Sequence, residues 1–138
     1  LHEGGIITPC IIHWPAKIKP QKGYKDGIGH VIDLLPTSLE IAGASPKNLP
    51  GQSLSFLWNN KNAPTRTYCW EHEGNKAIRQ GDWKLVKDQE DPHWELYDLK
   101  SDPCESKDLT DAKPEMVEKM IDDYTKWALQ VGVKPDKN

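Results

Sequence analysis

The sequence predicts an α+β fold in which a four-stranded antiparallel sheet is packed by a long C-terminal helix, with a strand, a loop and a helix of an α/β layer in front of it. Three observations support this prediction. Residues 6–14 form an almost continuous apolar run. After residue 66, short β-rich segments are separated by turn residues. Near the C-terminus, apolar residues recur at three- and four-residue spacing.

The N-terminal part contains one predicted strand and one predicted helix. The run "IITPCIIHW" at residues 6–14 follows Gly4-Gly5 and is typical of a strand covered on both faces. A polar loop, "PAKIKPQKGYKDG", comes next. In "HVIDLLPTSLEIAG", Asp33 can cap a helix and Pro36 suits its first turn. The apolar side of this helix consists of Leu35, Leu39, Ile41 and Ala42.

Residues 44–66 are rich in Pro, Asn and Gly and form the best linker candidate, with "SLSFLWN" as a short helical turn. The segments "TYCWEH", "KAIR", "WKLVK" and "WELYDL" follow, joined by short turns, which predicts a meander of antiparallel strands. In "WELYDL" the apolar residues fall on both sides of the strand, so the pattern does not identify the buried face.

The C-terminal helix has the clearest signal. Pro114 suits its first turn, Gly132 its end, and Pro135 lies just beyond it. Its apolar stripe is expected to pack on the inner face of the meander. The stripe consists of Val117, Met120, Ile121, Tyr124, Trp127 and Ala128.

Composition excludes several classes of function. The formal charge of −3 comes with scattered Lys and Arg, so no basic stripe for nucleic acid is present. No apolar run approaches the roughly 18 residues of a membrane helix. The cysteines Cys10, Cys69 and Cys104 form no C-x-x-C pair, and the five histidines show no i, i+4 pair, so no metal site is predicted.

His72 is the candidate ligand contact among the histidines. It lies in "WEHEGN", between two glutamates and just before a turn, where a side chain can project from a strand end. The neighbouring carboxylates favour a cationic imidazole, which suits an anionic ligand. The alternative is a histidine whose hydrogen bonds are satisfied within its own loop.

The motifs, taken in order, resemble the C-terminal part of a sulfatase. "HEGGIITPCIIHWP" is similar to the E-G-G-x-x-x-P strand of the family, "HVIDLLPTSLEIAG" to its D-x-x-P-T helix and "LPGQSL" to its G-x-S-L turn. "WEHEGNKAIRQGDWKLV" resembles the R-x-G-x-W-K segment, and "WELYDLKSDPCESKDL" resembles the L-Y-D-L-x-x-D-P-x-E segment. "WEHEGN" and the ending "WALQVGVKP" resemble the bacterial arylsulfatase branch in particular.

The resemblance implies an enzyme that hydrolyses sulfate esters with a formylglycine nucleophile and calcium. That nucleophile arises within a C-x-P-S-R type motif, and none of the three cysteines here is followed by such residues. The resemblance therefore implies that no catalytic residue, calcium ligand or sulfate-contacting lysine lies in this chain. The missing partner would be the N-terminal sulfatase domain, which has an alkaline-phosphatase-like α/β fold. Because bacterial members of the family are commonly exported, the resemblance also implies a periplasmic or secreted protein.

The resemblance also assigns roles and domains. His2 and Glu3 would lie at the edge of the site with structural roles, and His72 would contact the organic part of the substrate. Arg79 and Lys84 would serve the structure of the terminal lobe. Residues 1–60 would be the trailing strand and helix of the large domain, and residues 61–138 the C-terminal lobe.

Two hypotheses remain open from sequence. The first is an inactive C-terminal piece of a sulfatase that shapes the rim of the substrate pocket. The second is a stand-alone module whose exposed Trp83, Trp94 and Trp127 bind a glycan or a protein, although these positions also suit a core. Under the first hypothesis the apolar strand at residues 6–14 is uncovered, which predicts a dimer or strand exchange.

Overall fold

The structure is a computed structural model that describes residues 1–19, 27–45, 47–59 and 65–134. The chain forms two compact units. Residues 1–9 and 65–138 are called the sheet–helix lobe below, and residues 10–64 the middle region. The predicted boundary between residues 60 and 61 and the predicted stop at Pro135 lie outside the described residues. The assignment of residues 1–60 to a large sulfatase domain stays a prediction.

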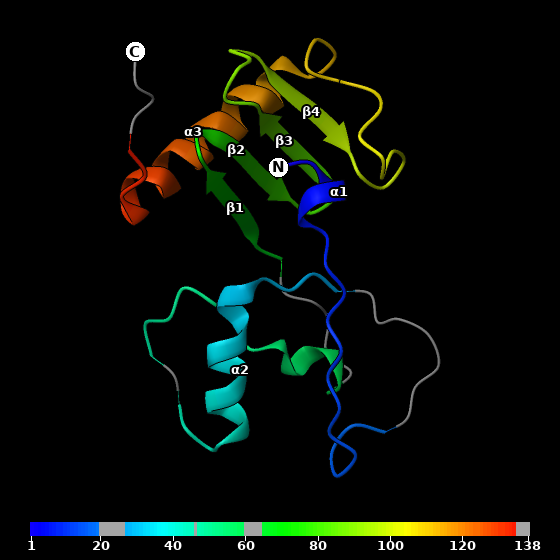
Figure 1. Ribbon diagram of the computed structural model, residues 1–138, viewed down its shortest axis with the longest axis vertical. Coiled ribbons are helices and arrows are strands. Elements are labelled where there is room, and N and C mark those ends of the chain that lie inside the picture. The colour runs from blue at the N-terminus through cyan, green and yellow to red at the C-terminus, as the bar shows by residue number, and fades with distance from the viewer. Residues whose placement is uncertain (20–26, 46, 60–64, 135–138) are drawn as a thin grey trace. The chain divides into compact units, whose positions relative to one another are not determined.

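The predicted meander is confirmed as a four-stranded antiparallel sheet with the strand order β1-β2-β3-β4 (Figure 1). Its strands are β1 (Thr67–His72), β2 (Asn75–Gln80), β3 (Trp83–Lys87) and β4 (Trp94–Asp98). Two-residue turns join the first three strands. In the β1–β2 turn, Glu73 and Gly74 both have positive φ, 51° and 84°, which matches the right-handed twist of a tight hairpin.

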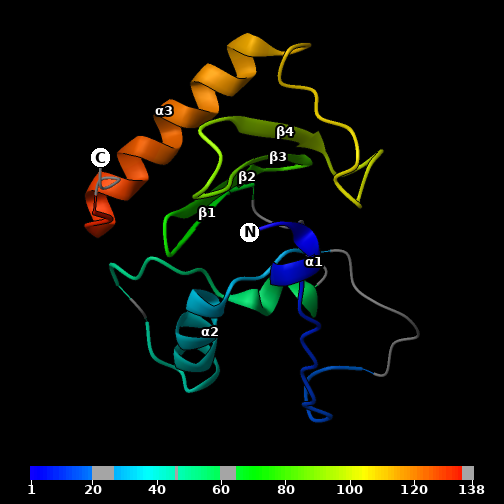
Figure 2. The same cartoon turned by 45° about the horizontal axis from the view of Figure 1, so that its top comes forward.

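The C-terminal helix α3 (Pro114–Val131) begins and ends where the sequence predicts. Pro114 occupies its first turn, and Gly132 ends it in the left-handed conformation, with φ 76°. One face of the sheet packs against this helix (Figure 2). The shared core consists of Ile78, Leu85 and Leu96 from the sheet and Val117, Met120 and Tyr124 from the helix.

The opposite face of the sheet also buries apolar side chains. Ala77, Val86, Tyr97 and Leu99 form a second cluster, against which Leu1 and Trp70 pack. The short helix α1 (Glu3–Ile6) lies on this side, away from α3 (Figure 2). Because both faces of β4 are covered, its apolar residues do not alternate, which explains the ambiguous pattern of "WELYDL".

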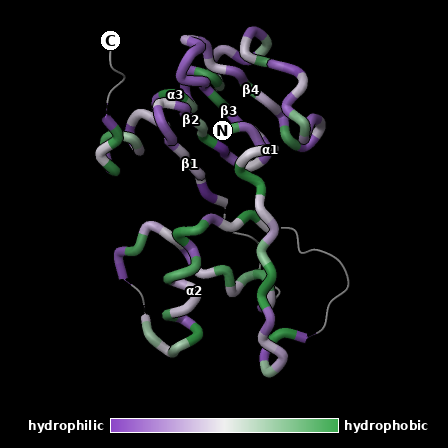
Figure 3. The backbone as a smooth tube through the Cα atoms, in the orientation of Figure 1, coloured by the Kyte–Doolittle hydropathy of each residue, from purple (hydrophilic) through white to green (hydrophobic). Residues whose placement is uncertain are grey.

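The predicted strand at residues 6–14 is wrong. Residues 3–6 form α1, and residues 7–14 have no regular secondary structure. A strand of a parallel sheet needs a neighbour to accept and donate its backbone hydrogen bonds, and the described residues place no strand beside this segment. Figure 3 shows its hydrophobic colouring, and Ile7 and Ile11 are 68% and 91% exposed. A Cβ added at Gly4 or Gly5 would meet nothing within 4 Å, so no close approach requires these glycines here.

The middle region contains η1 (Val31–Asp33), α2 (Leu34–Ile41) and η2 (Leu54–Leu57), which confirms the predicted helix and helical turn. Asp33 caps a helix as predicted: its carboxylate accepts from His30 N in a capping box at η1, although it makes no side-chain cap to α2 itself. The same carboxylate accepts from Gln52 N. The apolar side of α2 is largely exposed. Within the described residues, no helix is long and apolar enough to cross a membrane.

Candidate functional site

The sheet–helix lobe contains a buried lysine. Lys84 lies on β3 and faces the side of the sheet that carries α1, and its side chain is 0% exposed. Its ammonium nitrogen lies 2.8 Å from Glu3 Oε1 and 2.9 Å from Glu105 Oε1. A buried ammonium needs such partners, because an unpaired charge in a protein interior costs several kcal/mol.

Glu3 has both carboxylate oxygens engaged. While Oε1 accepts from Lys84, Oε2 accepts from Arg79 Nη1 at 3.0 Å, and the Glu3 side chain is 8% exposed. The Arg79 Nε also donates to Gly81 O at 3.0 Å, so the β2–β3 turn orients the guanidinium. These contacts give Glu3 a structural role, as the resemblance implies, and its place beside a substrate stays a prediction.

Glu105 holds the N-terminal segment at two further points. Its Oε2 accepts from the backbone N–H of Glu3 at 2.6 Å and lies 3.1 Å from Nδ1 of His2. The Glu105 side chain is 3% exposed, whereas that of His2 is 47% exposed. The cluster formed by His2, Glu3, Arg79, Lys84 and Glu105 is called the charge cluster below.

The loop after β4 shapes the backbone that presents Glu105. Glu105 has φ 55°, a left-handed conformation that is uncommon for a residue other than glycine. The Asp102 carboxylate accepts from Ser106 N at 2.8 Å and from Lys107 N at 2.9 Å, which closes the loop around Glu105. The hydrogen bond from Lys107 N is the main cause of the lowered pKa of Asp102. Asp102 thus supports the conformation of Glu105.

His72 lies far from the charge cluster along the sheet. It ends β1, four residues beyond Tyr68, which pairs with Arg79 on β2. At a rise of about 3.3 Å per residue, this separates the two positions by roughly 13 Å. The His72 side chain is 73% exposed, and its Nε2 lies 4.0 Å from Glu73 Oε2. The structure therefore brings His2 and Glu3 together and leaves His72 apart.

The cysteines and the acidic residues form no reactive centre within the described residues. Burial, together with the charge of Asp123, raises the pKa of Cys69 to about 12, so its thiol is a weak nucleophile at neutral pH. Cys10 and Cys104 are exposed free thiols. No group of three His, Cys, Asp or Glu side chains among the described residues could hold a metal ion. The described residues therefore do not fit a calcium site.

The tryptophans of the lobe pack against its core instead of forming an exposed row. Trp83, Trp94 and Trp127 are partly buried against the cluster between the sheet and α3. The Trp94 and Trp127 rings lie 5.6 Å and 5.5 Å from that of Tyr124. This arrangement counts against a stand-alone module that would bind a glycan or a protein through these three rings.

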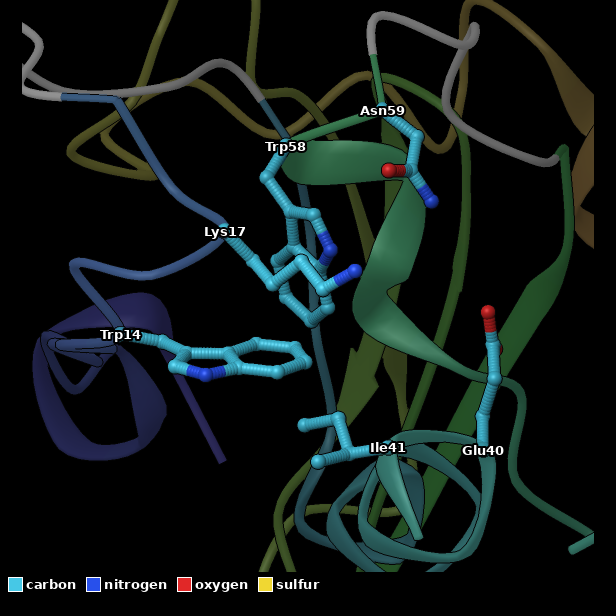
Figure 4. A pocket seen from close by; sticks show the side chains of 6 residues that line it. All are labelled: Trp14, Lys17, Glu40, Ile41, Trp58 and Asn59. Atoms are coloured by element: carbon cyan, nitrogen blue, oxygen red, sulfur yellow. The ribbon is translucent and has the colours of Figure 1, made fainter. Parts of the chain in front are cut away.

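A hollow of about 320 Å³ lies in the middle region (Figure 4). Figure 4 shows indole rings and a lysine on one side and two side chains of α2 on the other. None of its lining residues belongs to the sequence-predicted site. They are Trp14, Lys17, Glu40, Ile41, Trp58 and Asn59.

Sequence reasoning missed the role of Glu105 and the link from Lys84 to Glu3. One signal could have indicated both. Three of the sulfatase-like motifs carry these charged residues: Glu3 in E-G-G, Lys84 in R-x-G-x-W-K and Glu105 in D-P-x-E. A lysine in a strand flanked by apolar residues predicts a buried ion pair, and these acidic residues were the available partners.

Comparison with known proteins identifies related chains along nearly the whole sequence. Residues 1–129 match the family described as N-sulphoglucosamine sulphohydrolase, C-terminal. The chain is 31% identical to an uncharacterised sulfatase of Schizosaccharomyces pombe, over 95% of this chain and 26% of that protein. It is 32% identical to arylsulfatase K of Xenopus laevis, over 96% of this chain and 29% of that protein. The chain thus spans about a quarter of the length of these curated relatives.

Solved structures show the same fold. A structure of a protein in complex with its substrate D-glucosamine-2-N,6-O-disulfate aligns with a TM-score of 0.59 at 25% identity, over 77% of this chain and 25% of that one. A Bacteroides thetaiotaomicron structure from work on glycosaminoglycan metabolism aligns with a TM-score of 0.67 at 23% identity, over 88% of this chain and 28% of that one.

Proposed function

This chain belongs to the sulfatase family and is similar to the C-terminal portion of its members, and from that premise we propose that it serves in an enzyme that hydrolyses sulfate esters. In that enzyme the sheet–helix lobe would shape the rim of the substrate pocket. The observation that carries this proposal is the family match over residues 1–129.

The reactive groups would come from the part of a sulfatase that these residues do not cover. No cysteine here lies in a formylglycine motif, and the Cys69 thiol is held protonated by burial. We therefore assign the formylglycine nucleophile and the calcium ligands to the preceding part of a longer chain. The matched relatives, of which this chain spans about a quarter, are long enough to hold such a part.

Turnover of an aryl sulfate tests this proposal. The 138-residue chain should show no hydrolysis, with or without calcium, whereas a longer chain that carries a formylglycine-matured sulfatase domain before Leu1 should hydrolyse the ester. A sulfated hexosamine assayed in parallel would separate aryl from glycan substrates.

In the longer chain, His72→Ala should raise KM and leave kcat unchanged, with the exposed His93→Ala as its control. Hydrolysis by the 138-residue chain, or an unchanged KM, would contradict the corresponding assignment.

We also propose that the 138-residue chain self-associates through its uncovered apolar surface. Ile7, Ile11, Leu34, Leu35 and Ile41 are between 46% and 91% exposed, and exposed apolar surface favours association. Light scattering should give a mass above 15.7 kDa that falls toward this value in the double variant Ile11→Lys, Leu35→Lys. A monodisperse monomer of the unmodified chain would refute it.

A further inference from the structure

We propose that Lys84 and Glu105 are positioning residues that hold residues 2–6 against the sheet, so that the sheet–helix lobe sets the conformation of this segment. The segment is the one that borders the sulfate-ester pocket if the proposed function is right, and to that extent the inference rests on it. Neither residue touches the substrate in this proposal. They act through Glu3 and His2.

The charge cluster is matched in charge. Its two carboxylates, on Glu3 and Glu105, face the ammonium of Lys84 and the guanidinium of Arg79, with three carboxylate–cation distances between 2.8 and 3.0 Å. Glu3 is the only acidic member that comes from the N-terminal segment; Glu105, Arg79 and Lys84 belong to the sheet and the loop after it. Without the Glu3 carboxylate, Lys84 would keep Glu105 as its partner, and Arg79 would lose its contact with Glu3.

The position of Lys84 indicates that the sheet selects which segment of the chain packs on this face. Val86 on the same strand and Tyr97, which pairs with Lys84 on β4, are both buried on this face. An apolar residue at position 84 would fit these neighbours and would accept any apolar segment laid over the sheet. A buried lysine accepts only a segment that supplies a carboxylate at the right place, because an unpaired buried charge is costly. The lysine therefore selects the segment that carries Glu3.

Glu105 adds contacts that fix the segment's backbone. Its carboxylate accepts the Glu3 N–H, and α1 begins at that residue. The next turn is closed by Gly5 N and Ile6 N, which donate to His2 O, and by Ile7 N, which donates to Glu3 O. Glu105 holds this contact from a left-handed backbone conformation, which a non-glycine residue adopts only when its surroundings maintain it. The loop is thus built to present this carboxylate.

Hydrogen exchange of the 138-residue chain tests the positioning without any assay of activity. Glu3→Gln leaves Lys84 paired with Glu105, so the sheet and α3 should stay folded. We expect the amides of Gly5, Ile6 and Ile7 to exchange at least tenfold faster, while the amides of Ile78 and Leu85 do not change. The control variant Glu118→Gln, at an exposed position of α3, should alter neither set. Unchanged exchange at residues 5–7 in Glu3→Gln would overturn the proposal.

Lys84→Met and Glu105→Gln extend the test to the two positioning residues. Each should speed exchange at residues 5–7 as Glu3→Gln does. If Lys84→Met does not fold, the exchange rates of Glu105→Gln decide whether the cluster holds residues 5–7. This variant keeps the shape of the side chain and removes only its charge. Protection at residues 5–7 that survives Glu105→Gln would contradict the role of Glu105.

A double-mutant cycle in a longer, active sulfatase chain separates positioning from a general loss of stability. Glu3→Gln and Lys84→Met should each lower kcat/KM at least tenfold, and the double variant should lose no more than the stronger single variant, because both act through one contact. Additive losses would show that Lys84 acts independently of Glu3 and would overturn the proposal. If even the unsubstituted long chain hydrolyses no sulfate ester, the proposed function fails, and the exchange results alone decide whether residues 2–6 are held in this way.

Discussion

The sheet–helix lobe and the middle region are held together by different interactions. The lobe buries apolar side chains on both faces of its sheet, with Ile78, Leu85 and Leu96 at 0% exposure. In the described part of the middle region, Leu54 is the one buried large hydrophobic side chain, while Leu35 and Ile41 are 55% and 46% exposed. The lobe therefore has a hydrophobic core of its own, and the described part of the middle region does not.

Polar contacts to the backbone organise the middle region instead. Asp33 accepts from Gln52 N, and Thr37 Oγ1 accepts from Leu54 N at 2.9 Å. At Gly51 a Cβ would lie 2.0 Å from Ile32 O, so only glycine fits there. These contacts fix a local shape with little apolar burial. The lobe thus buries its apolar side chains within itself, whereas the described part of the middle region leaves most of its large apolar side chains exposed.

The largest expected difference between the two regions comes from the same truncation made in each. Leu96→Ala removes a fully buried side chain and should lower the free energy of unfolding by about 2–5 kcal/mol. Leu35→Ala removes one that is 55% exposed and should change it by less than about 0.5 kcal/mol. Chemical denaturation followed by Trp fluorescence measures both. Equal losses would mean that Leu35 is buried in solution.

A smaller effect is expected from the Thr37 hydroxyl of the middle region. Thr37→Val keeps the shape of the side chain but removes its hydroxyl, which accepts from Leu54 N and donates to Asp33 O. The free energy of unfolding should fall by about 1–3 kcal/mol, because a buried N–H loses its partner. Faster exchange of the Leu54 amide would show this locally. Ser38→Ala is the control, since its exposed hydroxyl bonds only its own helix at Leu34 O. An unchanged Leu54 amide in Thr37→Val would show that this bond does not hold the region.

The smallest expected effect is on the acid stability of the lobe. Burial alone would raise the pKa of Asp108, but hydrogen bonds from the Thr110 hydroxyl and from Leu96 N outweigh it and lower the pKa below 3.8. The unfolded chain then binds the proton more readily, so this contribution is present above about pH 4 and is lost as pH falls through the folded-state pKa. Thermal melts measured at a series of pH values test this. The Tm of Asp108→Asn should fall less steeply between pH 4 and about pH 2 than the Tm of the unsubstituted chain. Identical slopes would refute the assignment, and the exposed Asp122→Asn should leave the slope unchanged.

The elements predicted well from sequence are those whose signals are local. The hairpins follow from turn residues such as Gly74, and α3 follows from the apolar stripe between Pro114 and Gly132. Such patterns need no knowledge of distant residues. The α+β class and all four strands could therefore be predicted.

The errors lie where distant partners decide the structure. The apolar run at residues 6–14 has the composition of a buried strand, but no described strand pairs with it. The apolar side of α2 follows from the sequence pattern, but most of it is exposed among the described residues. Composition shows what a segment can bury and cannot show whether a partner is present.

The candidate site was predictable as a set of motifs but not as a geometry. Glu3 and Lys84 are separated by 81 positions, and no periodicity connects them. The motifs identified the charged residues, and only the fold shows that Glu3, Lys84 and Glu105 meet, while His72 lies at the other end of β1.

The outer edge of β4 is closed by the chain that follows it. Leu109 N donates to Leu96 O at 2.8 Å, and the side chains of Asp108 and Thr110 accept from Leu96 N. These bonds occupy the groups through which another strand would extend the sheet at this edge. At this edge the sheet is therefore closed to extension by a foreign strand, in an aggregate or in a complex.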